Sequence, residues 1–203
     1  LAHQLGIRFA WETLDGLYQY LDPTILREDL LRGVFYLHAQ PPLFNLFLGA
    51  VLKLFPTASP TIFSFVFGLT ALGLLLGMAW LMRKLEVSDT VSGIVLLIFA
   101  LSPNFPVYRN WLFYTLPVAA LLVLGGICLQ RHLDSGRWLS LGAFLASAAS
   151  LMMIRSVYHP LWLIVLVAVL APLVPVSRRR GLLTGSVVVL LLGAETRAAY
   201  QDH

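Results

Sequence analysis

The feature that most constrains this chain is a series of long apolar runs, of which the two longest contain no charged residue. The two longest cover residues 60–82 and 112–130. About 20 apolar residues in a helix cross the ~30 Å hydrocarbon core of a bilayer, and the helix satisfies its own backbone polar groups there. Only 12% of the 203 residues are charged, against about 25% in soluble domains. The sequence therefore predicts an all-α fold, a polytopic bundle of membrane helices.

Seven apolar runs follow the first forty residues and predict about six to seven helices in a single membrane domain over 41–203. The runs cover 41–55, 60–82, 91–103, 112–130, 139–153, 158–176 and 181–194. Short connections separate them, among them 104–111, 131–138, 155–157 and 177–180.

The first forty residues are more polar and contain five of the ten acidic residues. Apolar residues recur at helical spacing, first at 14–21 and then at Ile25, Leu26, Leu30 and Val34. Asp22 followed by Pro23 suits the start of the second helix, with Asp as N-cap and Pro in the first turn. This pattern predicts an outward-facing loop, residues 1–40, with two short amphipathic helices that lie along the membrane surface.

Basic residues occupy every second connection and predict the orientation of the bundle. They are Arg83, Lys84, Arg131, Arg137 and Arg178–Arg180. Loops rich in Arg and Lys stay in the cytoplasm, so the connections at 104–111 and 155–157 are expected on the outer or luminal side. The run 41–55 is roughly 22 Å long as a helix and contains Lys53. It is expected to enter only the outer leaflet, and a tilted full crossing is the alternative.

Three segments on this predicted outer side combine polar groups with aromatic residues and Pro: 36–43, 102–114 and 155–160. Arg155 and His159 are four residues apart and could neutralise a phosphate; alternatively, Arg155 extends to lipid headgroups and His159 sits at the interface. Asp22 or Asp15 could act as a general base if burial raised its pKa. The alternative for each acid is a solvated or helix-capping role.

The chain resembles the GT-C glycosyltransferases. The likeness rests on the acidic segment, the motif His38-x-Gln40-Pro-Pro-Leu after it, and the Ser102-Pro103 turn that precedes an aromatic loop. Within that superfamily it is similar to the polyprenyl-phosphate-dependent branch, which includes dolichyl-phosphate-mannose protein mannosyltransferases and the aminoarabinose transferases of lipid A. The motifs are short and span roughly residues 12–180.

The resemblance implies an inverting enzyme that moves a sugar from a polyprenyl monophosphate to an acceptor on the outer face. It implies Asp22 as the favoured general base and Asp15 as the second choice. The residues implied to contact the substrate or its phosphate are His38, Gln40, Arg109, Asn110, Tyr114, Arg155 and His159. The chain departs from the family pattern in two ways: the adjacent Asp-Glu pair is missing, and Gln40 replaces a basic residue before Pro-Pro.

The expected partners are a polyprenyl-phosphate-linked sugar, membrane lipids and an acceptor of unknown kind, with no nucleic acid, because the basic residues lie at helix ends. The residues indicate no metal site, although a requirement for a divalent metal ion is left open.

We expect a multi-pass integral membrane protein, of the bacterial cytoplasmic membrane rather than the endoplasmic reticulum, and a piece of a longer chain. The alternatives are a transporter or flippase, and a non-catalytic assembly subunit. In the latter, Gly68, Gly73 and Gly77 offer close-approach surfaces for helix packing, and Gly73 and Gly77 have the small-xxx-small spacing.

Overall fold

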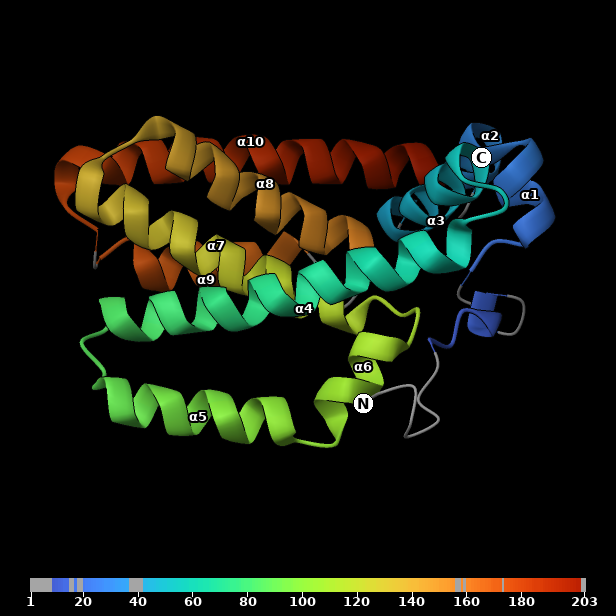
Figure 1. Cartoon of the computed structure of the whole chain (residues 1–203). Coiled ribbons are helices and arrows are strands. Elements are labelled where there is room, and N and C mark those ends of the chain that lie inside the picture. Colours follow the sequence, from blue (N-terminus) through green and yellow to red (C-terminus); the bar gives the residue numbers. More distant parts are fainter. Residues whose placement is uncertain are drawn as a thin grey trace.

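The computed structural model describes residues 9–14, 17, 20–36, 42–155, 158, 160–172 and 174–201, without the side chains of residues 160, 178 and 192–201. This part of the chain is almost wholly helical (Figure 1). Its one β-type contact is an isolated bridge between Ala10 and Trp111. The all-helical prediction is therefore confirmed.

Two of the described helices, α4 (Ser59–Lys84) and α7 (Thr115–Ser135), are long and apolar enough to cross a membrane. A third crossing is available if α5 (Asp89–Leu101) and α6 (Asn104–Asn110) count as one span, although they are bent by 60° relative to each other. The sequence predicts a loop where α6 lies. Pro106 does not prevent this short helix, because the first turn of a helix tolerates Pro.

The remaining apolar runs also contain helices: α3 (Pro42–Leu54), α8 (Trp138–Ile154), α9 (Pro160–Leu170) and α10 (Val176–Gln201). Two boundaries differ from the sequence prediction. The run 158–176 stops being helical at Leu170, because Pro172 and Pro175 lack the N–H that would continue it. The three arginines at 178–180 then lie inside α10 and not in a loop.

The helices run back and forth between two ends of the bundle (Figure 1). At one end, Lys84 of α4 forms an ion pair with Asp134 of α7 (3.3 Å), and Arg131 stacks on Trp80. The other end, here called the α6 end, holds α1, α2, α6, the start of α7 and the end of α8. Segment 104–111 and Arg155, which were predicted to share the outer side, thus both lie at the α6 end, away from the basic residues of α4 and α7.

Close packing of α4 on α7 depends on Gly77. A β-carbon at this position would lie 2.6 Å from Val123 Cγ1, so only glycine allows the two helices to approach this closely. Gly73 does not share this role, because nothing lies within 4 Å of the corresponding point. The predicted pairing of the two glycines as one packing motif is therefore wrong.

The N-terminal segment forms less helix than its periodicity predicts. Among the described residues before Asp22, only the 3-10 turn η1 (Glu12–Leu14) is helical, and the second helix is divided at Asp29 into α1 (Pro23–Glu28) and α2 (Leu30–Phe35). Both pieces nevertheless bury the predicted apolar stripe of Leu26, Leu30 and Val34, which packs with α3. Ile25 is the exception and is 42% exposed.

Candidate functional site

The α6 end is closed by contacts between the start of the described chain and the segment that joins α6 to α7. The backbone N–H of Ala10 donates to the carbonyl of Asn110 (2.7 Å), and the N–H of Leu112 donates to the carbonyl of Ala10 (3.4 Å). Trp111 between them is extended. The acidic N-terminal segment and the aromatic segment are about 100 positions apart in the sequence. These backbone hydrogen bonds nevertheless join them directly.

Tyr20 adds a buried side-chain bond to this junction. Its hydroxyl donates to the carbonyl of Leu112 (2.7 Å), and its ring packs between Phe44 of α3 and Phe113. Burial raises the pKa of the Tyr20 hydroxyl well above its ordinary value, and the neighbouring Tyr114 adds to the shift. The hydroxyl therefore stays protonated and keeps its role as a donor.

A continuous ladder of aromatic rings follows α6 into α7. The ring of Trp111 stacks on Tyr108 (centroids 6.0 Å apart) and on Phe113 (4.5 Å), and Phe113 contacts Tyr114 (4.0 Å). At the far end of the ladder, the guanidinium carbon of Arg155 lies 5.4 Å from the centre of the Tyr114 ring. Arg155 immediately follows α8 and is half-buried. An interaction of this kind holds a cation in place without neutralising it.

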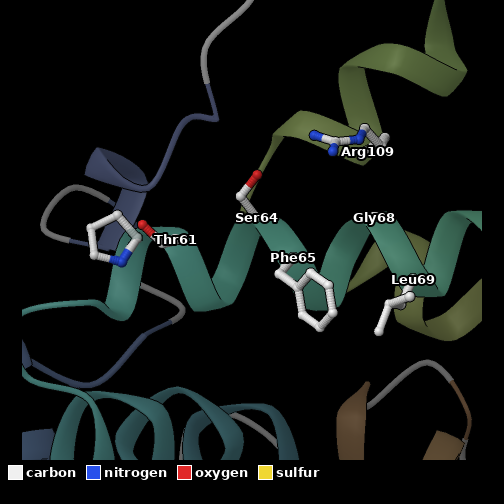
Figure 2. A pocket seen from close by; sticks show the side chains of 7 residues that line it. Thr61, Ser64, Phe65, Gly68, Leu69 and Arg109 are labelled. Atoms are coloured by element: carbon white, nitrogen blue, oxygen red, sulfur yellow. The ribbon is translucent and has the colours of Figure 1, made fainter.

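Arg109 occupies a separate position, in a shallow groove between α4 and α6. The groove has a volume of about 640 Å³ and is lined by Pro60, Thr61, Ser64, Phe65, Gly68, Leu69 and Arg109. Figure 2 shows the Ser64 hydroxyl on the side of α4 that faces Arg109, while Phe65 and Leu69 point away from it. One nitrogen of the guanidinium, Nη1, donates to the side-chain oxygen of Asn110. We call this hollow the Arg109 groove.

Gly68 creates the space that the Arg109 guanidinium fills. A β-carbon at position 68 would lie 3.2 Å from Nη2 of Arg109, closer than ordinary van der Waals contact. Asn110, the partner of Arg109 on α6, is itself held in place, because its amide nitrogen donates to the carbonyl of Pro106 (2.8 Å). The position of Arg109 is thus determined by both helices.

Asp22, the favoured catalytic base, is exposed and caps α1. Its carboxylate accepts a hydrogen bond from the backbone N–H of Thr24 (2.7 Å), as the Asp-Pro pattern predicts. This bond, together with a second one from the Thr24 side chain, lowers the pKa of Asp22. A general base works best with a pKa raised toward neutrality, so the environment of Asp22 suits a structural role. Its catalytic role stays a prediction.

Four of the other predicted site residues lie outside the described residues: Asp15, His38, Gln40 and His159. Among the described side chains, no group of three or more His, Cys, Asp or Glu residues is arranged to hold a metal ion. Of the predicted substrate contacts, the structure thus brings Tyr114 and Arg155 together and places Arg109 and Asn110 together in a second group.

Sequence reasoning did not identify Thr61, Ser64 and Gly68 as neighbours of Arg109. The signal was present, because these polar or small residues recur at intervals of three and four within an otherwise apolar run and so share one face of a helix. The missing information was the identity of the helix opposite that face. Tyr20 was missed for a similar reason, since its partner is a backbone carbonyl.

Comparisons of the chain with family models, with curated proteins and with solved structures gave no match.

Proposed function

We propose that the protein is a membrane glycosyltransferase that takes its sugar from a polyprenyl-phosphate carrier and acts at the α6 end. The main support is the junction described above: Ala10 and Tyr20 of the N-terminal segment contact the segment that joins α6 to α7, and Arg155 stacks on Tyr114 of that same segment. Transfer from a phosphate leaving group needs a base and a cation. The N-terminal segment supplies carboxylates that are candidates for the base, and no described carboxylate forms an ion pair with Arg155, the candidate cation.

In the proposed reaction, an acceptor hydroxyl attacks the anomeric carbon of the sugar. A carboxylate of the N-terminal segment, Asp15 or Asp22, takes the hydroxyl proton. The bond between the anomeric carbon and the phosphate oxygen breaks, and both bonding electrons stay with the phosphate. Arg155 stabilises the additional negative charge of the departing lipid phosphate by charge-assisted hydrogen bonds. Attack from the face opposite the phosphate inverts the anomeric configuration.

The cation–π contact gives Arg155 a fixed position before substrate arrives. Stacking on Tyr114 holds the guanidinium plane at one end of the aromatic ladder, and a fixed donor contributes more to transition-state stabilisation than one that must reorganise. Arg155 is half-buried, so water screens it less than it screens the exposed Arg27 of α1. Replacement of Arg155 by Gln should reduce transfer about 100-fold.

The test uses the full chain in lipid nanodiscs with a set of polyprenyl-phosphate sugars, and mass spectrometry measures release of the free polyprenyl phosphate. Arg155→Gln should lose activity while Arg27→Gln, a matched change of an exposed arginine, should retain it. Asp15→Asn and Asp22→Asn identify the base: one of them should abolish release without affecting insertion. Equal release by the wild type and Arg155→Gln, or no release from any donor, contradicts the proposal.

A further inference from the structure

The Arg109 groove lies beside the N-terminal half of α4, a helix long enough to span a membrane. This helix has 26 residues and is therefore about 39 Å long, some 9 Å more than the ~30 Å hydrocarbon core of a bilayer. With the excess shared between the two ends, the first turn, which contains Thr61, reaches the interface, and Ser64 lies just inside it. From the groove, a ridge of exposed apolar side chains continues down α4. The ridge consists of Phe65 (62% exposed), Leu69 (53%), Leu72 (53%) and Leu76 (61%).

The polar part of the groove is a compact set of donors. Among the described residues, no carboxylate lies within ion-pair distance of Arg109, and Asn110, which accepts a hydrogen bond from its Nη1, is uncharged. Its Nη2 rests against the backbone of α4 at Gly68. The hydroxyls of Thr61 and Ser64 lie one turn apart and line the same hollow. A guanidinium with nearby hydroxyls and no acidic partner is complementary to a phosphate group.

We propose that the Arg109 groove binds the phosphate of an anionic phospholipid from the surrounding bilayer, with an acyl chain along the exposed α4 ridge. The groove is shallow and offers one cation and two hydroxyls, a set that gives weak binding. Weak binding suffices for a lipid that surrounds the protein at high concentration, but not for a scarce ligand. Basic pockets between membrane helices recognise anionic headgroups in this way.

Occupancy of this groove has a consequence for the α6 end. Arg109 is the last but one residue of α6, and two residues later Trp111 pairs with Ala10. A phosphate held between Arg109 and α4 would therefore fix α6 against α4 and, through Trp111, steady the junction with the N-terminal segment. This proposal concerns lipid binding and does not depend on sugar transfer.

The test measures lipid retention by native mass spectrometry of the full chain, taken from nanodiscs of phosphatidylcholine with or without phosphatidylglycerol. The wild type should retain phosphatidylglycerol in preference to phosphatidylcholine. Arg109→Gln should lose this preference, with retention about tenfold lower, as expected for the loss of one charge-assisted bond. Arg27→Gln removes an exposed arginine of α1 and should behave as the wild type.

A second pair of variants tests the groove without changing charge. Gly68→Leu fills the space under the guanidinium, whereas Gly73→Leu makes the same change on the same helix where nothing lies within 4 Å. Only Gly68→Leu should lower phosphatidylglycerol retention. Equal retention by Gly68→Leu and Gly73→Leu, or by Arg109→Gln and the wild type, overturns the proposal. So would a wild type that retains the two lipids equally.

Discussion

Replacement of Tyr20 by Phe removes a single hydroxyl group from the junction between the N-terminal segment and the start of α7. The residue is 8% exposed, and its hydroxyl donates to the carbonyl of Leu112 (2.7 Å). The ring contacts with Phe44 and Phe113 are kept in the variant, because Phe has the same ring. The change therefore isolates one buried hydrogen bond.

The size of the effect follows from what happens to the Leu112 carbonyl. A buried hydrogen bond contributes about 0.5–1.5 kcal/mol, and a carbonyl left without any partner costs about 1–3 kcal/mol. The Thr13 hydroxyl already lies 3.5 Å from the same carbonyl and can shift toward it. We therefore expect a loss of about 1–1.5 kcal/mol in the free energy of unfolding, where the two ranges overlap. This corresponds to about a tenfold change in the folded-to-unfolded ratio.

The measurement is reversible unfolding in mixed detergent micelles, with Tyr36→Phe as the matched control. Tyr36 is 52% exposed, so removal of its hydroxyl should change stability by less than about 0.5 kcal/mol. Thr13→Val combined with Tyr20→Phe should cost more than the sum of the single changes, because the carbonyl then loses both donors. A loss for Tyr20→Phe no larger than for Tyr36→Phe would refute this account of the junction.

Two further predictions concern a helix cap and a helix contact. The pKa of Asp22 is lower in the folded protein than its ordinary value of 3.8, so its contribution to stability is present above that pH and is lost as the pH falls through the lowered native pKa. Asp22→Asn keeps a capping side chain but does not titrate. When the pH is lowered below about 4, the melting temperature of this variant should therefore fall less than the melting temperature of the wild type. Gly77→Ala should destabilise the protein by about 1–3 kcal/mol because of the overlap with Val123. Gly73→Ala should instead be neutral or stabilising by up to about 1 kcal/mol, and detergent unfolding that ranks the two variants the other way would contradict the packing.

Much of the helical architecture could be predicted from the sequence because it depends on local composition. Each apolar run contains a helix, and the Asp22-Pro23 pattern marks the start of α1. Boundaries were less predictable where Pro competes with hydrophobicity. Pro172 and Pro175 end α9 early, whereas Pro106 is accommodated in the first turn of α6.

The candidate site was less predictable, because its geometry depends on which helices are neighbours. The sequence indicates that Arg109 and Arg155 are cations near aromatic residues. It does not indicate that Tyr114 holds one of them, whereas Gly68 makes room for the other. The sequence also cannot tell which of two glycines packs against a neighbour. Gly73 and Gly77 both have the spacing of a packing motif, but only Gly77 faces another helix.

The bridge between Ala10 and Trp111 also has a consequence for biosynthesis. Its two members lie about 100 positions apart, and a ribosome that adds about 5–20 residues per second needs about 5–20 s to make the interval. During this time α1 and α2 can pack on α3, but Ala10 and Tyr20 lack their partners at 110–112, and α4 and α5 must enter the membrane before Trp111 exists. The end of the bundle where we place the function is therefore completed late, and a nascent chain stopped before residue 111 would lack it.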